Sequence, residues 1–249
     1  MGSPEQQSTV IESGPPPGFI DSILGVFTSP REAFLGMLRK PSFWMPLLAI
    51  LAINLAFTGI WLSKVDPGEF MKAQMIESGQ WDKMPAESRQ QVLETQGKFF
   101  PVFAWVGGLL GPPIVLAIIT GVLLFIYRFF YAGQVNFKQS ATLVSYISLA
   151  FSIVTVPLML LILFLKQDWS LNPQDVVQAN ATLLLDREAV PKALWAFAGS
   201  MDLLVFWQLW LLAVAFGVAT GRRTASAIWG VVTPWALIVL TKVVWKLFF

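Results

Sequence analysis

Five long apolar runs dominate this chain of 249 residues and restrict what it can fold into. They cover about 43–63, 99–127, 139–165, 193–220 and 224–245. A helix needs about 20 apolar residues to cross the hydrocarbon core of a bilayer. The runs do not alternate in polarity, as the strands of a membrane barrel do. We therefore predict an all-α, polytopic membrane protein with five transmembrane helices.

The composition leads to the same class. Hydrophobic residues make up 55% of the chain and charged residues 13%. The charged fraction is about half that of an ordinary soluble domain, so the chain cannot cover a globular surface with polar groups. We expect the lipid bilayer to be its surroundings. A net charge of +2 gives no reason to expect nucleic acid as a partner.

Two residue types that serve much of enzyme chemistry are missing. The sequence has no Cys and no His, which removes thiolate nucleophiles, imidazole bases and the commonest transition-metal ligands. A carboxylate site for Mg²⁺ or Ca²⁺ stays open in principle. We expect no enzyme activity, no cofactor and no bound metal.

The short loops suggest an orientation. The loop between the second and third runs carries Arg128 and Lys138, and the loop between the fourth and fifth carries Arg222 and Arg223, without an acidic residue in either. Short loops rich in Lys and Arg stay in the cytoplasm. We expect the N-terminus on that side and, with an odd number of spans, the C-terminus on the other.

The remaining segments differ in character. Residues 1–17 are polar, end in three prolines and are expected to be a disordered tail; residues 18–249 are expected to form one five-helix domain. Ser29 to Lys40 predicts an interfacial helix, with Ser29 and Glu32 as a capping box. The alternative is a helix packed on the protein's own cytoplasmic face. The longer loops, 64–98 and 166–192, are expected to hold short helices, one over 86–96, and to cap one membrane face.

Asp202 is a carboxylate inside the fourth apolar run. If the helix begins near Ala193, the carboxylate lies roughly 14 Å inside and needs a polar partner. Three interpretations are open: a contact between helices, a helix that begins near Asp202 and leaves the carboxylate at the headgroups, or an ion or proton relay. The candidate partners in other runs are Ser145, Tyr146, Thr155, Thr233 and Asn54.

The second run holds a cluster of small and helix-breaking residues. Gly107 and Gly111 form a small-xxx-small pair that lets helices approach closely. Pro112 and Pro113 lack backbone donors and are expected to kink or break the helix. Broken helices line substrate sites in some transporters, although a packing kink is the more frequent meaning.

The order of several short motifs resembles a known family. Phe27-Thr28-Ser29-Pro30-Arg31-Glu32-Ala33-Phe34 precedes the first run, Met84-Pro85-Ala86-Glu87 lies in the loop, and Ser200-Met201-Asp202-Leu203 opens the fourth run. This arrangement is similar to the bacterial branch of the Yip-domain (Ypt-interacting-protein) family. The resemblance implies five spans, a cytoplasmic N-terminus and a bacterial inner membrane. Eukaryotic relatives associate with prenylated Rab-type GTPases, and the family offers no catalytic residues to carry over.

Two functions follow as expectations. The first is a non-catalytic membrane scaffold that organises membrane proteins or lipids, with other membrane proteins or a second copy of the chain as partners. The alternative is a small transporter or lipid-moving protein that uses the kinked second span and Asp202.

Overall fold

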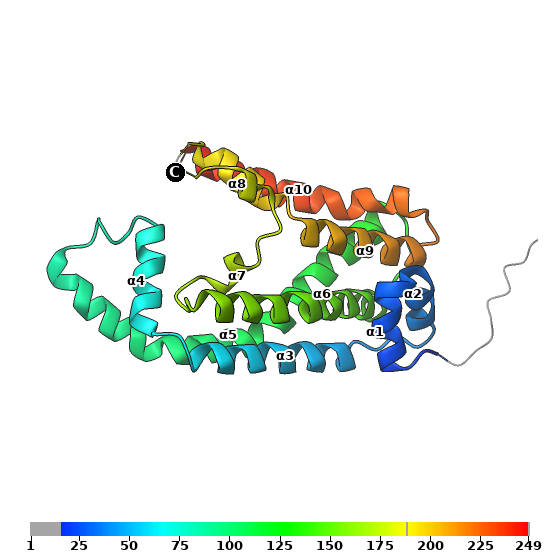
Figure 1. Cartoon of the computed structure of the whole chain (residues 1–249). Helices are drawn as coiled ribbons and strands as arrows, with labels where there is room; N and C mark the ends of the chain where they lie inside the picture. Colours follow the sequence, from blue (N-terminus) through cyan, green and yellow to red (C-terminus); the bar gives the residue numbers. More distant parts are fainter. Residues whose placement is uncertain (1–15, 188, 249) are drawn as a thin grey trace, which may run out of the picture.

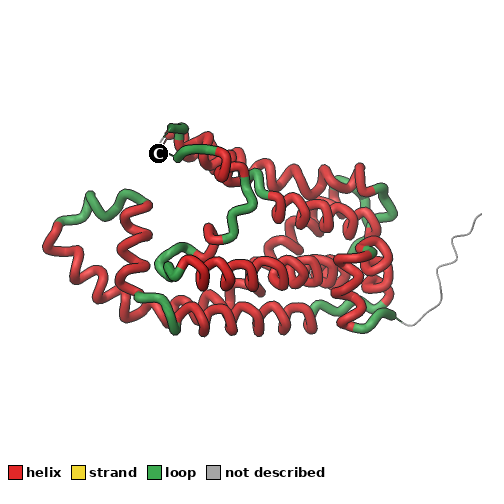
Figure 2. The backbone as a smooth tube through the Cα atoms, in the orientation of Figure 1, coloured by secondary structure: helices red, strands yellow, loops and turns green. Residues whose placement is uncertain are grey.

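The structure is a computed structural model that describes residues 16–187 and 189–248. Most of the predicted tail, residues 1–15, lies outside the described residues. Within the described ranges the chain is helical, and β-structure is limited to one isolated bridge (Figure 2). The all-α prediction is therefore confirmed. The helices are α1 (Phe19–Thr28), α2 (Pro30–Arg39), α3 (Trp44–Leu62), α4 (Pro67–Glu77), α5 (Ala86–Phe129), α6 (Phe137–Lys166), α7 (Pro173–Val176), the 3₁₀ turn η1 (Ala181–Leu184), α8 (Lys192–Ser200), α9 (Leu203–Ala219) and α10 (Thr224–Phe248).

Four of the described helices are long and apolar enough to cross a membrane: α3, α5, α6 and α10. The helix α9 is apolar but has only 17 residues. Figure 1 shows these five helices running along the long axis of the molecule. The helices α1 and α2 lie at one end, called here the N-terminal face, and α4 lies at the other, called the opposite face.

The fourth predicted span is not a continuous helix, and the prediction of one helix over 193–220 is wrong. The chain leaves helical geometry at Met201 and Asp202, which separate α8 from α9. Both helices pack against α10. The helices α8 and α9 therefore lie one after the other alongside α10, and the break between them lies partway along α10 (Figure 1).

The helix α5 is longer than predicted. It runs without interruption for 44 residues and contains Pro101, Pro112 and Pro113. Residues 86–96 are helical, as predicted, but they form the first part of α5 and not a separate short helix. Of the kink or break predicted at the paired prolines, the break does not occur. Each proline removes one donor, whereas a full break in lipid would leave several backbone groups without partners, which costs more. At 1.5 Å per residue α5 measures roughly 66 Å, about twice the thickness of the hydrocarbon core.

The helix predicted to lie in the headgroup plane is packed into the bundle instead. The side chain of Phe34 in α2 is completely buried and that of Met37 is 4% exposed, and α2 contacts α6 and α9. This is the alternative reading of the segment. The capping box is wrong, because the side chain of Ser29 makes no cap hydrogen bond. Ser29 also ends α1, where its N–H donates to the carbonyl of Gly25. Because Ser29 is the single residue between α1 and α2, the two helices together fix its backbone conformation.

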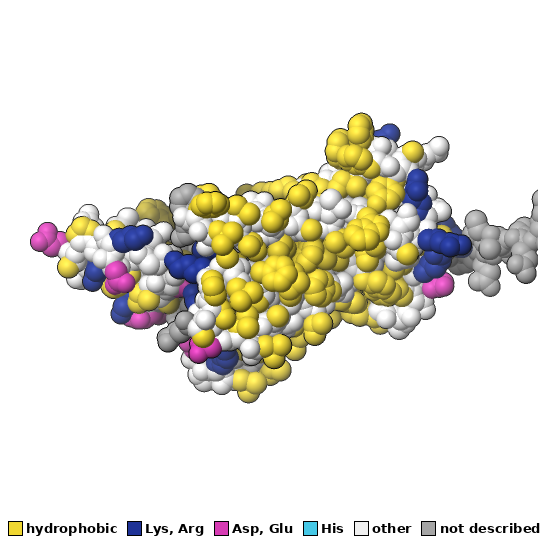
Figure 3. Space-filling view, turned by 90° about the horizontal axis from the view of Figure 1, so that it is seen from above, with side chains coloured by type: hydrophobic (Ala, Val, Ile, Leu, Met, Phe, Trp, Pro, Cys, Tyr) yellow, Lys and Arg dark blue, Asp and Glu magenta, His cyan; other side chains and the backbone are white. Residues whose placement is uncertain are grey.

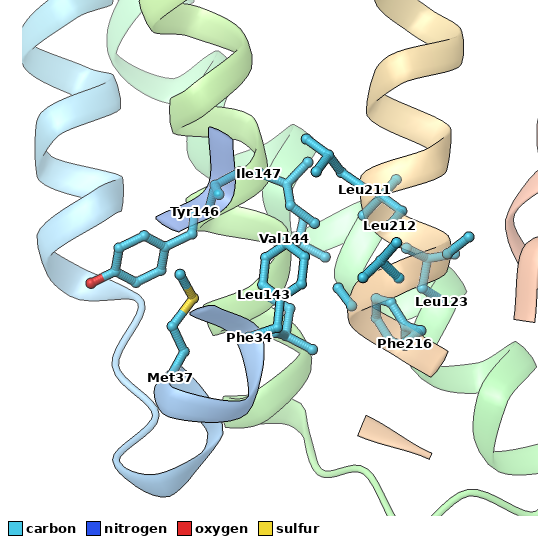
Figure 4. Close-up of a cluster of buried hydrophobic side chains, with 14 of the residues drawn as sticks. Phe34, Met37, Leu123, Leu143, Val144, Tyr146, Ile147, Leu211, Leu212 and Phe216 are labelled. Atoms are coloured by element: carbon cyan, nitrogen blue, oxygen red, sulfur yellow. The ribbon is translucent and has the colours of Figure 1, made fainter. Parts of the chain in front are cut away.

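The largest buried cluster joins α2 to the middle of the bundle. Phe34 lies among Leu143, Val144 and Ile147 of α6 and the side chains of α9 that Figure 4 shows. In the same cluster, the ring of Tyr127 in α5 stacks on the ring of Phe216 in α9, with the ring centroids 4.6 Å apart. The Tyr127 hydroxyl donates to the carbonyl oxygen of Ala227.

Gly230 makes the close contact between α5 and α10 possible. A Cβ at this position would lie 2.8 Å from Cζ of Tyr127. Real Cβ atoms do not approach a ring carbon so closely, so any larger residue would push α10 away from the Tyr127 ring.

The short loops at the N-terminal face are held together by polar contacts. Asn136 and Gln139 form a full capping box at the start of α6. The guanidinium of Arg222 donates to the carbonyl of Tyr131 at 2.8 Å and lies 5.3 Å from its ring. These contacts connect the α5–α6 loop to the α9–α10 turn.

The two long loops meet at the opposite face, as expected. The indole N–H of Trp61, in the last turn of α3 just before the first of these loops, donates to the carbonyl of Trp169 in the second loop at 3.3 Å. Arg187 and Glu77, one from each loop, form an ion pair at 3.4 Å. Charged side chains gather at the two ends of the molecule and apolar side chains cover the middle (Figure 3). The surface is therefore that of a protein with lipid around its middle.

Candidate functional site

A groove with several polar side chains lies between α3, α5, α6 and α9. Its volume is about 460 Å³. Polar side chains come from three of the helices: Asn54, Ser148, Ser152 and Gln208. The wall supplied by α5 contains Gly107, Gly111 and Pro112. We call this the polar groove.

The polar groove lies at the middle depth of the bundle. Asn54 follows the first residue of α3 by ten positions, Ser148 follows the first of α6 by eleven, and Gln208 precedes the last of α9 by eleven. All three of these helix ends are at the N-terminal face (Figure 1). At 1.5 Å per residue the side chains lie roughly 15–17 Å from that face, about half the thickness of a hydrocarbon core.

The polar side chains of the groove are poorly satisfied by the protein itself. Asn54 donates to the carbonyl of Ile50 in its own helix at 3.0 Å. The hydrogen bonds among the described residues include none from the side chains of Ser148, Ser152 or Gln208. In hydrocarbon an amide without a partner is costly, and such residues mark functional positions more often than chance.

The small residues of the second span have an unexpected role. A Cβ at Gly107 or at Gly111 would meet nothing within 4 Å, so neither glycine mediates a contact between described helices of this chain. Gly108 does so instead, because a Cβ there would lie 2.8 Å from Oγ1 of Thr58 in α3. Gly107, Gly111 and Pro112 line the open groove, whereas Pro113 is not among its lining residues.

Asp202 is outside the polar groove and has a different function. Its Oδ1 accepts hydrogen bonds from the N–H groups of Leu204 at 2.8 Å and Val205 at 3.1 Å, which caps α9. Its Oδ2 accepts from the N–H of Ala179 at 3.2 Å. The residue is 9% exposed. We call these contacts, together with the backbone bridge beside them, the Asp202 knot.

The Asp202 knot also satisfies the backbone at the break. The N–H of Leu203 donates to the carbonyl of Ala179 at 3.0 Å, and the N–H of Ala181 donates to the carbonyl of Met201 at 3.2 Å. Non-helical backbone near the membrane needs such partners. The 17 residues of α9 place Asp202 roughly 26 Å from the N-terminal face, near the far boundary of the hydrocarbon core.

The predicted partners of Asp202 are not used. Three of them bond to carbonyls in their own helices: Ser145 to Thr142, Thr155 to Phe151, and Asn54 to Ile50. The Asp202 carboxylate accepts from the backbone N–H groups of Ala179, Leu204 and Val205, and not from the side chains of Tyr146 or Thr233. Backbone donors at the break take the place of side chains because the first N–H groups of α9 have no intrahelical acceptor.

Gln208 is the main groove residue that sequence reasoning missed. It is the only polar residue in α9, and Asn54 is the only amide side chain in α3. A lone amide in the middle of an apolar run was therefore the available signal. The meeting of these amides with two serines of α6 depends on tertiary packing and has no local signature.

The described residues contain no group of three or more His, Cys, Asp or Glu side chains placed to hold a metal ion. The chemistry available in the polar groove is hydrogen bonding by amides and hydroxyls. These groups can bind and orient a polar group but cannot readily gain or lose a proton near neutral pH.

Comparison with known proteins gives one match. The family model described as the Yip1 domain matches residues 24–245, nearly the whole chain. No match is found among curated proteins or among solved structures. The matched range begins in α1 and ends in α10, so it includes the polar groove and the Asp202 knot.

Proposed function

This chain belongs to the Yip1 domain family, and from that premise we propose that it is a non-catalytic membrane scaffold that binds a transmembrane helix of another membrane protein. It is a multi-pass membrane protein with apolar helices suited to contact lipid. The polar groove is the observation that carries the proposal. Its amide and hydroxyl groups need hydrogen-bond partners at a depth where lipid offers only hydrocarbon.

The occupant follows from the chemistry of the groove. Acyl chains cannot bond to Gln208, and headgroups lie about 15 Å from the bilayer middle. A helix that carries a Ser, Thr, Asn or Gln side chain at mid-depth meets both requirements. Gly107 and Gly111 add to this argument, because their open surface allows the backbone of a partner helix to come close.

Photo-crosslinking in native membranes tests the proposal. A photoreactive residue at Gly107 is expected to give a discrete protein adduct. Gly121 is the matched control, because it is an exposed glycine of the same helix with nothing near its Cβ position and lies outside the groove. We expect Gln208→Leu to reduce the Gly107 adduct by about threefold to tenfold, as the loss of one interhelical hydrogen bond implies.

Two results would contradict the scaffold role. Equal adducts at Gly107 and Gly121 would mean that the groove has no specific occupant. An adduct that does not respond to Gln208→Leu would mean that the amide takes no part in binding. The mass of the adduct distinguishes a second copy of this chain from a different partner.

The transport alternative keeps one supporting observation, the polar lining of the groove at mid-depth. Asp202 does not support it, because its carboxylate is already used by three backbone donors. If the groove carried a solute, Gln208→Leu would abolish activity of the purified protein in vesicles without any partner present. The scaffold proposal expects no solute movement from either form.

We also propose five spans, with the N-terminus in the cytoplasm. The positions of α8 and α9 along α10 support counting them together as one crossing. Because the chain has no Cys, single cysteines can be introduced and labelled with an impermeant maleimide. We expect labelling from outside intact cells at Gln80 and Asp175 and protection at Gln134 and Arg223. Equal labelling at Gln80 and Gln134 would exclude this topology.

A further inference from the structure

A second cavity lies at the opposite face, far from the polar groove in the fold. Its volume is about 910 Å³, within the usual range of small-molecule sites. Its walls come from α4, the last turn of α6, α7 and the η1 segment. Both long loops therefore contribute to it. We call it the outer pocket.

Charges of both signs line the outer pocket. Arg187 and Glu77 pair with each other across it at 3.4 Å. Lys166 and Asp175 also line it, and neither forms a salt bridge with a described residue. A cavity that offers one unpaired ammonium and one unpaired carboxylate is complementary to a ligand with both an anionic and a cationic group.

The surroundings of Asp175 favour a cationic group beside it. Partial burial raises the pKa of the Asp175 carboxyl above its usual range, and the nearby Glu77 acts in the same direction. Lys242 and Arg187 oppose this shift but do not cancel it. The negative charge of the Asp175 carboxylate is therefore only partly balanced by the neighbouring cations, and the ammonium of a ligand would supply the remaining positive charge.

The position of Lys166 indicates an amphiphilic ligand. Lys166 is the last residue of the apolar helix α6, roughly 44 Å along the helix from the N-terminal face, so its ammonium lies beyond the far boundary of the hydrocarbon core, on the side of the headgroups. Ile162 lies one helical turn earlier and also lines the pocket. The wall thus changes from charged to apolar in the direction of the membrane. Leu171, Val176 and Leu183 add further apolar lining.

We propose that the outer pocket binds a zwitterionic phospholipid that carries a primary ammonium group. The phosphate contacts Lys166, the ammonium contacts Asp175, and an acyl chain leaves the pocket along α6 past Ile162. This site is independent of the helix-binding groove, and either proposal can fail without the other.

The test is lipid retention by the purified full chain, measured by native mass spectrometry from detergent. The probes are dioctanoyl phosphatidylethanolamine, dioctanoyl phosphatidylglycerol with the same chains and phosphate but no ammonium, and free phosphoethanolamine. We expect one phosphatidylethanolamine bound in preference to the other two. Lys166→Gln is expected to weaken its binding roughly tenfold, as the loss of a charge-assisted hydrogen bond implies.

Two further variants make the result specific. Asp175→Asn is expected to reduce phosphatidylethanolamine binding to the level of phosphatidylglycerol and to leave phosphatidylglycerol unchanged. Lys138→Gln is the matched control, because Lys138 lies at the other end of the same helix. An equal loss with Lys138→Gln, or no effect of Asp175→Asn, would overturn the proposal. Free phosphoethanolamine binding as tightly as the lipid would also overturn it, since the ligand would then be a soluble compound.

Discussion

Replacing Phe34 by alanine is expected to lower the free energy of unfolding by about 3–5 kcal/mol, the usual cost of removing a buried aromatic ring. The ring is completely buried between α6 and α9 (Figure 4). Its loss leaves a cavity at the place where α2 is attached to the bundle. Denaturation in detergent micelles, followed by tryptophan fluorescence, measures the change.

The neighbouring Leu35 provides the control. It is also apolar and lies in the same helix, but 46% of it is exposed. We expect Leu35→Ala to cost less than about 1 kcal/mol, because it creates no cavity. Similar losses for the two variants would show that α2 lies on a lipid surface and is not packed into the bundle.

Replacing Asp202 by leucine is expected to destabilise the protein by about 2–4 kcal/mol, from a lost helix cap together with a backbone donor left without an acceptor. Asp202→Asn retains an oxygen that can accept from Leu204 and Val205, so it is expected to cost about 1 kcal/mol or less. The same denaturation experiment compares the two variants. An Asn variant as unstable as the Leu variant would mean that the negative charge, and not the cap, stabilises the break.

The apolar runs were enough to predict the helices that are continuous. The predicted bounds 43–63 and 139–165 differ by only a few residues from α3 and α6. Long apolar periodicity is a strong signal because a bilayer requires length and composition together. The order of short motifs also predicts the Yip-domain family, and membership of that family is confirmed by the match over residues 24–245.

The failures share a physical cause, which is that the bilayer or the tertiary contacts override a local signal. Pro112 and Pro113 favour a kink or a break, but a break in the membrane would leave backbone groups without partners, so the helix continues past them. The run from 193 to 220 read as one helix, but Asp202 and the strand-like residues near Ala179 satisfy a break instead. Ser29 read as a cap, but its position between two helices prevents that geometry.

The polar groove was only half visible in the sequence. Gly107, Gly111 and Pro112 stand out in the sequence for their backbone properties. Gln208 is absent from the predicted site, although a single amide in an apolar helix is unusual. The groove forms because four helices place these residues at the same depth in the bundle. The sequence of one helix does not determine how deep the residues of a neighbouring helix lie.

The burial of Phe34 has a consequence for how the protein is made. The buried cluster that contains it includes Phe216 of α9, which lies about 180 positions later in the chain. At a synthesis rate of about 5–20 residues per second, the ribosome needs roughly 10–40 s to reach that point after Phe34 emerges. During this interval α1 and α2 have no finished surface on which to pack, and their apolar side chains need temporary cover from lipid or a chaperone. Of the described helices, α1 and α2 are therefore synthesised first but are among the last to reach their final positions.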